Sequence, residues 1–182
     1  MLRRFVCIVC GGALLAAAGG RAIAQETEKL APYYPTPETI VVKMLQLGEL
    51  KPGEKMFDLG SGDGRIVIMA ARKFKADATG VEFDKDLCRQ SSERIKRLGL
   101  DARARIVNGD IMKQDYSSAS LLTVYLLPGS NDRLRPLLEK QLKKGARVVS
   151  HDFEFADWTP EKTEHIEDDG EGRSHTLYLY RR

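Results

Sequence analysis

The sequence predicts an α/β fold, a doubly wound and mostly parallel sheet of seven strands with a C-terminal antiparallel hairpin. Three observations support this prediction. Short apolar segments of strand length alternate with segments of helical periodicity between residues 38 and 153. A glycine-rich stretch, "FDLGSGDGR" (57–65), follows the first apolar segment. Near the end, the turn "DGEG" (169–172) separates "KTEHIED" (162–168) from the alternating segment "SHTLYLYRR" (174–182), as in a β-hairpin.

The elements begin after a polar leader, residues 25–37, whose final "YYPTP" is held extended by its prolines. From Glu38, apolar residues recur at helical spacing in "ETIVVKMLQLGEL". Thr36 is available to cap this helix ahead of Pro37, which suits the first helical position. The segment "KPGEK" (51–55) then forms a turn.

Strands and helices alternate beyond that turn. The predicted strands are short and rich in apolar residues: "KMFDLG" (55–60), "DATGVEFD" (77–84), "ARIVNGD" (104–110), "SLLTVYLLP" (120–128) and "ARVVSHDF" (146–153). The predicted helices are "GRIVIMAARKF" (64–74), "KDLCRQSSERIKRLG" (85–99) and "SNDRLRPLLEKQLKKG" (130–145). We expect Ser130 or Asn131 to open the last helix and Gly145 to close it.

Residues 1–24 have the features of a secretory signal peptide. Two arginines precede an apolar run (5–18), and "AIA" (22–24) fits a small-residue cleavage site. The alternative is an uncleaved membrane anchor, although the run contains two glycines and is shorter than the roughly 20 residues of a spanning helix. Cleavage predicts a periplasmic or secreted protein, and retention predicts a domain anchored to the inner membrane.

The charged residues give no indication of a nucleic-acid partner. The chain has 29 lysines and arginines against 26 acidic residues, and loss of residues 1–24 would remove three arginines and balance the two signs. No dense basic cluster remains outside that segment. Cys88 would then be the one cysteine, which cannot form an internal disulfide. The three histidines lack close ligand spacing, so the sequence predicts no metal site.

The loop "DLGSGDGR" lies at the carboxyl end of the first predicted strand, where open α/β sheets bind ligands. Gly60, Gly62 and Gly64 let the chain turn sharply and bring bare backbone against a ligand. The loop lacks the lysine and hydroxyl pair of a phosphate loop, and its third glycine comes one place early for the dinucleotide pattern. Its acids, Asp58 and Asp63, instead suit a ligand that bears an ammonium group.

Acidic residues also follow the next two predicted strands. Glu82 lies about 20 residues past the loop, where a carboxylate can bind both hydroxyls of a ribose. Asp110 can accept a hydrogen bond from an adenine amino group. An amino acid, a ribose and an adenine together make S-adenosylmethionine. Each acid alone is also consistent with a helix cap or a turn, but their shared position at three successive strand ends favours a cofactor site.

With these residues the sequence resembles the class I S-adenosylmethionine-dependent methyltransferases over essentially residues 35–182. More narrowly, it is similar to bacterial relatives of the mitochondrial lysine methyltransferases that act on the ATP synthase c subunit and the adenine nucleotide translocase. The segments that carry the narrower resemblance are "YPTP" (34–37), "DLGSGDGRIVI" (58–68), "VYLLP" (124–128) and "RVVSHDF" (147–153) with Trp158.

The resemblance implies a Rossmann-like methyltransferase domain over residues 38–182 and a segment, residues 25–37, that helps to cover the cofactor. It implies S-adenosylmethionine-binding roles for nine residues: Tyr34, Thr36, Asp58, Gly60, Ser61, Gly62, Asp63, Glu82 and Asp110. The methionine end of the cofactor is expected near Tyr34 and Thr36. The implied methyl acceptor is a protein lysine, but the export-like N-terminus differs from the targeting segments of the eukaryotic proteins and leaves the acceptor open.

Catalytic candidates follow the fourth and fifth predicted strands. Tyr125 can contact or deprotonate an acceptor amine, but a tyrosine of the core is equally consistent. His151 and Asp152 can line an acceptor pocket or form a structural hydrogen-bonded pair. The acidic or asparagine-proline signature of many amine methylases is absent. The alternative to an enzyme is an exported binding or sensor protein without catalysis, which the export signal favours and the intact set of acids disfavours.

Overall fold

One seven-stranded sheet forms the centre of the molecule, whose computed structural model describes residues 34–182. The strands are β1 (Lys55–Leu59), β2 (Asp77–Glu82), β3 (Ala104–Asn108), β4 (Leu121–Val124), β5 (Arg147–His151), β6 (Lys162–Ile166) and β7 (His175–Arg181). Their order is β3-β2-β1-β4-β5-β7-β6. The first five pair in parallel, whereas β7 is antiparallel to both β5 and β6. The predicted α/β sheet and its C-terminal hairpin are confirmed.

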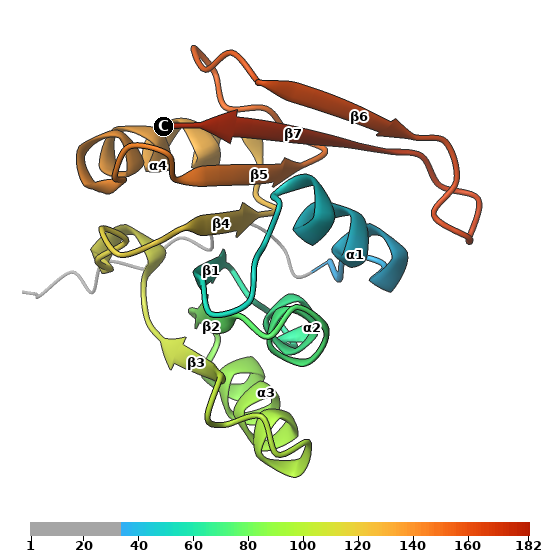
Figure 1. The fold of residues 1–182 in the computed structure, drawn as a ribbon, viewed down its shortest axis with the longest axis vertical. Coiled ribbons are helices and arrows are strands. Elements are labelled where there is room, and N and C mark those ends of the chain that lie inside the picture. Colours follow the sequence, from blue (N-terminus) through green and yellow to red (C-terminus); the bar gives the residue numbers. More distant parts are fainter. Residues whose placement is uncertain (1–33) are drawn as a thin grey trace, which may run out of the picture.

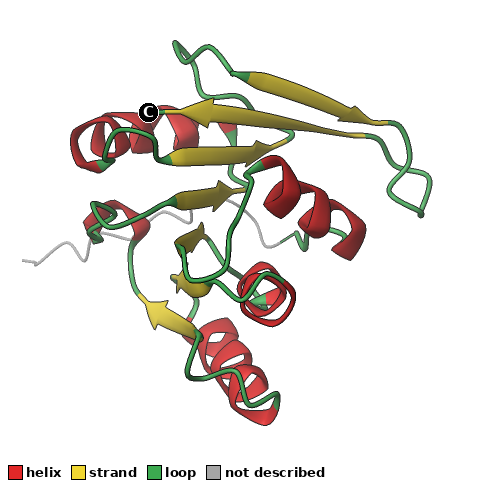
Figure 2. Cartoon of the chain, in the orientation of Figure 1, coloured by secondary structure: helices red, strands yellow, loops and turns green. Residues whose placement is uncertain are grey.

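Helices cover both faces of this sheet (Figure 1). Three of them, α1 (Glu38–Leu47), α2 (Arg65–Lys73) and α3 (Lys85–Arg97), lie on one side. Figure 2 shows α4 (Pro128–Gln141) on the other side, and a short 3-10 helix, η1 (Ile111–Lys113), follows β3. Neighbouring side chains on β5 point into the two different cores, with Val149 on the α1 side and Val148 on the α4 side. This double coverage explains why β4 is apolar and fully buried along its length.

Two helices begin at residues other than those predicted. The residue before α1 is Pro37, and no side chain caps that helix, so the predicted Thr36 cap is wrong. Helix α4 begins at Pro128, ahead of the predicted Ser130 or Asn131, because the fixed φ of proline suits a first helical position. It ends at Gln141, before the predicted closing residue Gly145.

The strand order places the candidate site residues at one edge of the sheet. Strand β1 pairs with β2 on one side and with β4 on the other, so the direction of winding reverses between β1 and β4. The carboxyl ends of β1, β2, β4 and β5 share an edge with the start of the antiparallel strand β7. Open α/β sheets bind their ligands at such an edge.

The predicted signal peptide or anchor (residues 1–24) and most of the polar leader (residues 25–33) lie outside the described residues. Within residues 34–182, no helix has the length and apolar character needed to cross a bilayer.

Candidate functional site

The glycine-rich loop between β1 and α2 is bound to the end of β2. The backbone N–H of Gly60 donates to the carbonyl oxygen of Val81 at 2.9 Å, and that of Gly62 donates to Glu82 Oε2 at 2.7 Å. Gly60, Gly62 and Gly64 have φ angles of 79°, 52° and 76°, in the left-handed region that glycine adopts without strain. The loop therefore brings backbone, unobstructed by side chains at three positions, to the carboxyl edge of the sheet.

Glu82 holds this loop through both of its carboxylate oxygens. Its Oε2 accepts from Gly62, and its Oε1 accepts from the backbone N–H of Asp84 at 2.8 Å. Each carboxylate oxygen has a second lone pair, so these bonds leave acceptor capacity for the hydroxyls of a ribose. The side chain is buried, which makes these two bonds important to the loop.

Asp58 is buried beneath the same loop. The hydroxyl of Thr123, on β4, donates to Asp58 Oδ1 at 2.7 Å. Burial raises the pKa of Asp58 to about 7 despite this bond, and the nearby charges of Glu82 and Asp63 add to the rise. A positively charged ligand at this edge would favour the ionised carboxylate, since opposite charges stabilise each other most strongly where water is excluded.

Asp63 and Asp110 already have partners within the protein. Asp63 Oδ2 lies 2.9 Å from Arg65 Nη2 and 3.4 Å from Arg94 Nη1. Although burial opposes it, these arginines lower the pKa of Asp63, so a ligand ammonium would compete with them. Asp110 Oδ1 accepts from the backbone N–H of Met112 at 2.8 Å and caps η1. The turn role is therefore observed for Asp110, whose second oxygen, Oδ2, lies 3.7 Å from Lys113 Nζ.

Ser61 Oγ is buried and has no hydrogen-bond partner among the described residues. Buried polar atoms in native proteins usually have a hydrogen-bond partner, because burying a polar group without one costs about 1–3 kcal/mol. Together with the loop backbone, Glu82 and Asp58, this hydroxyl makes a set of donors and acceptors suited to a ligand with hydroxyl and cationic groups.

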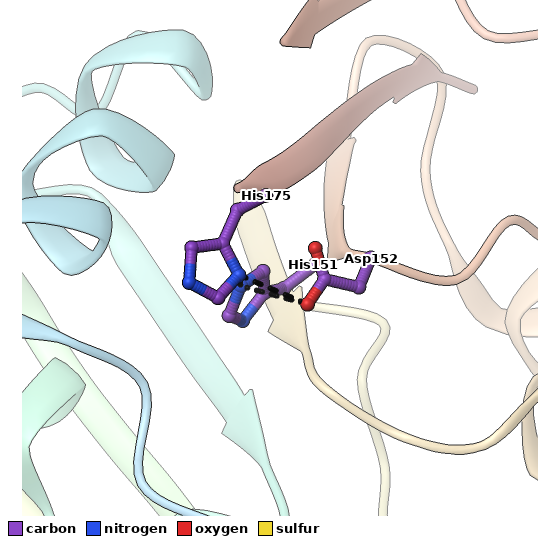
Figure 3. Close-up of side chains that lie close together, drawn as sticks. All are labelled: His151, Asp152 and His175. Atoms are coloured by element: carbon purple, nitrogen blue, oxygen red, sulfur yellow. Dashed lines mark hydrogen bonds and ion pairs between the residues drawn. The ribbon is translucent and has the colours of Figure 1, made fainter. Parts of the chain in front are cut away.

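A second group of polar side chains lies at the ends of β4 and β5 and the start of β7. The hydroxyl of Tyr125 donates to Asp152 Oδ2 at 3.3 Å, and the Tyr125 ring lies over His151 with centroids 3.9 Å apart. His151 Nε2 is 2.9 Å from His175 Nδ1. Figure 3 shows His151, Asp152 and His175 pointing toward one another from the two neighbouring strands.

The segment before α1 joins the two groups. The carbonyl oxygen of Thr36 accepts from Arg65 Nη1 at 2.8 Å, and Thr36 Oγ1 lies 3.4 Å from His151 Nδ1. Tyr34 is half exposed, and its hydroxyl accepts from Arg173 Nη1 at 2.6 Å. Tyr34 and Thr36 therefore lie at the same edge as the glycine loop, which is where the resemblance places a segment that covers the cofactor.

The electrostatics limit what the two catalytic candidates can do. Burial, with the charge of Asp152 adding to it, raises the pKa of Tyr125 to about 12. Tyr125 is therefore a hydrogen-bond donor at neutral pH and does not deprotonate an amine. His151 is fully buried, and burial lowers its pKa to about 4, so it is neutral and does not reach a substrate. His151 Nε2 lies 3.4 Å from Asp152 Oδ2. The sequence left open whether this pair lines an acceptor pocket or is structural, and the geometry favours a structural pair.

Sequence reasoning did not place His175 and Asp169 in this group. His175 Nε2 lies 3.3 Å from Asp169 Oδ2, which brings two more hairpin residues to the end of β5. Histidine spacing along the sequence did not reveal that His151 and His175 are neighbours, because antiparallel pairing of β5 with β7 brings distant residues together. Only His165 stays apart, with its Nδ1 3.0 Å from the hydroxyl of Thr176. Knowledge of the strand order is the signal that would have identified this cluster.

Comparison with known proteins decides the family. A family model described as the ANTKMT methyltransferase domain matches residues 58–162, from the end of β1 to the start of β6. The chain belongs to this family. It is an S-adenosylmethionine-dependent methyltransferase, and the enzyme predicted from the sequence is confirmed over the non-catalytic alternative.

Two relatives of this ANTKMT-family chain differ in how much of their length it spans. A protein-lysine N-methyltransferase of Saccharolobus islandicus (strain REY15A) is 43% identical over 150 residues, which are 82% of this chain and 92% of that protein. A lysine N-methyltransferase of Rattus norvegicus, named for the ATP synthase c subunit, is 37% identical over 123 residues, 68% of this chain and 55% of that protein. The chain therefore spans about half of the rat protein.

A solved structure supports the cofactor assignment. The crystal structure of an RNA methyltransferase from Salinibacter ruber in complex with S-adenosyl-L-homocysteine has a TM-score of 0.76 and 40% sequence identity. The match covers 81% of this chain and 93% of that one. The predicted cofactor, S-adenosylmethionine, is confirmed. The groups at the carboxyl edge fit it: Glu82 with spare acceptor capacity, a glycine loop with exposed backbone, the buried acid Asp58 and the unpartnered hydroxyl of Ser61.

Proposed function

We propose that this methyltransferase transfers methyl groups to the side-chain amine of lysine residues in a protein. The observation that carries the proposal is the 43% identity to the Saccharolobus islandicus protein-lysine N-methyltransferase, over 92% of that protein. Other relatives support the same acceptor, since they are lysine N-methyltransferases named for the ATP synthase c subunit and for the adenine nucleotide translocase.

The residues at the carboxyl edge divide the work of binding. We assign Glu82 to the ribose, the loop backbone and Ser61 to the amino-acid end, and Asp58 to the positive charge of the cofactor. Asp110 is assigned to the adenine through Oδ2, where the adenine amino group would share this oxygen with the exposed Lys113. Tyr34 and Thr36 cover the methionine end, and Asp63 orders the loop through its ion pair with Arg65.

The protein contributes to the reaction by positioning the reacting groups and by excluding water. S-adenosylmethionine, when bound, would supply a methyl group on a sulfonium sulfur. The acceptor amine, having given its proton to solvent, would attack the methyl carbon in line while the carbon–sulfur bond breaks and S-adenosylhomocysteine leaves. The protein must therefore hold the amine on that line and keep water out. The ring of Tyr125, which stacks with Phe153 at a centroid distance of 6.2 Å, offers an aromatic surface that attracts the cationic lysine before its proton is lost.

The acceptor can be identified by methyl transfer from tritiated S-adenosylmethionine into a cell extract. We expect label that is sensitive to protease and resistant to ribonuclease, and acid hydrolysis should release it as methyllysine. Labelled RNA would overturn the proposal and would point to an RNA acceptor, as named for the Salinibacter ruber methyltransferase. The lack of a dense basic cluster supports the protein acceptor. A Glu82→Gln variant is the control that should transfer much less label at low S-adenosylmethionine concentration.

We further propose that residues 1–24 direct the chain to the membrane, where they are removed on export or retained as an anchor. The basic start, apolar run and small-residue site support this proposal. Mass spectrometry of the N-terminus distinguishes removal from retention, and reporters active on only one side of the membrane locate the domain. Recovery of the intact chain wholly in the soluble cytoplasmic fraction would contradict the proposal.

A further inference from the structure

Three side chains at the junction of β5 and β7 present one ligand atom each to a common point. These atoms are His151 Nε2, Asp152 Oδ2 and His175 Nδ1, and all lie within 4.8 Å of one another. The separations are 2.9 Å between the two nitrogens, 3.0 Å from His175 Nδ1 to Asp152 Oδ2, and 3.4 Å from His151 Nε2 to the same oxygen. Atoms bound to one metal ion at about 2.0–2.2 Å and at angles of about 90–110° lie at such separations.

The far side of each ligand is already held by another group. His175 Nε2 faces Asp169 Oδ2 at 3.3 Å, and Asp152 Oδ1 accepts from the backbone N–H of Thr176 at 2.9 Å. Both ring nitrogens of His175 thus face carboxylates, which can only accept, and a metal ion that replaces a proton at Nδ1 leaves the Nε2–H donating to Asp169. A histidine held by a carboxylate through its second nitrogen is the usual arrangement behind a metal ligand.

His151 is oriented in the same way but with a more adaptable partner. Its Nδ1 lies 3.4 Å from Thr36 Oγ1, a hydroxyl that can donate or accept. When Thr36 accepts, His151 Nε2 has a free lone pair, and either a proton on His175 Nδ1 or a metal ion then lies between the two facing nitrogens. When Thr36 donates, a proton on His151 Nε2 fills the same space. The occupant of this junction is thus either a metal ion or a shared proton.

We propose that His151, Asp152 and His175 form a binding site for a divalent transition-metal ion of the Zn²⁺ type. Two imidazoles and one carboxylate suit zinc and ferrous iron, whereas Mg²⁺ and Ca²⁺ prefer sites made of oxygen alone. The histidines are buried, and the side chain of Asp152 is 24% exposed. An ion enters past Asp152 and keeps its remaining coordination positions on that side, next to Tyr125.

The site also has a structural consequence. Its ligands end β5 and begin β7, so a bound ion ties the C-terminal hairpin to the parallel part of the sheet. An ion that binds only the folded chain stabilises it by mass action. The proposal is independent of the identity of the methyl acceptor, because it can be tested without turnover.

The test uses the full chain without a histidine tag, titrated with Zn²⁺ in a calorimeter and then melted with and without the metal. We expect one Zn²⁺ per chain and, at a hundredfold excess over the dissociation constant, a rise of about 5–10 °C in the unfolding midpoint. Mg²⁺ should produce neither effect. Co²⁺ should give the visible absorption of a low-symmetry site with nitrogen ligands.

Variants locate the binding. Asp152→Asn and His175→Gln should each weaken Zn²⁺ binding at least tenfold and remove most of the rise in midpoint. Asp152 has a φ of 60°, a conformation that asparagine tolerates, so Asp152→Asn should fold. His165→Gln, on the same hairpin, and Cys88→Ser are the matched controls and should bind Zn²⁺ as the unaltered chain does. Absence of binding, unchanged binding in Asp152→Asn, or equal loss in either control would overturn the proposal.

Discussion

Asp58 shows how one buried carboxyl links the fold to the charge of the ligand. Its neighbours Glu82 and Asp63 are also acidic, and the one hydrogen bond from Thr123 does not offset the loss of water. Ionisation of a buried carboxyl at this position costs free energy when no cation is near, and it is favoured when a cationic ligand lies beside it. The residue therefore makes the ligand-free protein less stable at neutral pH and the bound protein more so.

The stability of the ligand-free protein should reflect this group. The folded pKa of about 7 exceeds an unfolded value near 3.9, so the folded state binds the extra proton between these values. The contribution of Asp58 to the free energy of unfolding should fall as the pH rises from about 4 to about 7, by up to about 4 kcal/mol. Denaturant titrations across that range should show the decline in the unaltered chain and in an Asp101→Asn control. The decline should be smaller in Asp58→Asn, and an equal decline in all three would contradict this assignment.

Cofactor binding should have the opposite dependence on pH. Binding of the cationic cofactor favours ionised Asp58, so affinity for S-adenosylmethionine should rise up to tenfold per pH unit until about pH 7 and then level off. Calorimetry in two buffers of different ionisation enthalpy should detect the released proton near pH 6.5. In Asp58→Asn the affinity should be lower at pH 8 and nearly independent of pH. Proton release that persists in this variant would point to another group.

Glu82→Gln should separate the role of Glu82 in the loop from its role in binding. Glutamine offers one acceptor oxygen where Gly62 and Asp84 need two, so one backbone N–H loses its partner. We expect a loss of about 1–2 kcal/mol in the free energy of unfolding. Affinity for S-adenosylmethionine should fall at least tenfold, measured by calorimetry. Glu93→Gln, on the exposed side of α3, is the control that should change neither quantity.

At the scale of elements, the glycine loop depends on a close approach between Ser61 and β2. A Cβ added at Gly80 would lie 2.5 Å from Ser61 Oγ and 2.7 Å from the Cδ1 of Ile106. These neighbours belong to the loop and to β3, both packed against β2, so neither can withdraw freely. Absence of a side chain in the middle of β2 is thus what lets the loop lie against the strand.

Gly80→Ala should therefore destabilise the protein by about 1–3 kcal/mol and displace the loop enough to weaken cofactor binding. The matched control is Gly129→Ala, in the first turn of α4, where a Cβ meets nothing within 4 Å. That change should leave stability unaltered or raise it by up to about 1 kcal/mol, because alanine is the better helix former. Thermal denaturation compares the two. Equal effects would show that crowding at Gly80 is relieved by movement of its neighbours.

The sequence predicted which segments form strands and helices better than it predicted where the helices end and which strands lie side by side. Period and composition were enough for each strand and helix, because a strand covered on both faces must be apolar and a surface helix amphipathic. Helix ends were less predictable: α4 begins at Pro128, whose fixed φ suits a first helical position, and Thr36 faces His151 instead of capping α1. The glycine loop was predictable because its residues are contiguous. The cluster around His175 was not, since it depends on β7 lying between β5 and β6.

For the whole molecule, the start of the described chain meets the turn of the C-terminal hairpin at the site. Arg173 donates to the hydroxyl of Tyr34, 139 residues away, and its guanidinium lies 5.8 Å from the centre of that ring. The hydroxyl of Thr39 donates to the carbonyl oxygen of Asp169, between positions 130 residues apart. The C-terminal hairpin therefore holds the segment that runs along the carboxyl edge, and we expect closure over the cofactor to depend on this hairpin.

Arg173→Gln should weaken this closure at a moderate cost in stability. The side chain of Arg173 is 38% exposed, but that of its partner Asp169 is fully buried, so the loss should be about 1–3 kcal/mol, more than for an exposed ion pair. Release of Tyr34 should raise the dissociation constant of S-adenosylmethionine several-fold. Arg181→Gln removes a comparable exposed pair with Glu161 at the far end of β7 and is the control. Calorimetry measures cofactor affinity and denaturant titration measures stability in both variants. Equal cofactor affinity in the two would mean that the hairpin does not hold Tyr34 over the site. A much larger loss of stability in Arg173→Gln alone would instead mean that Arg173 is needed for folding.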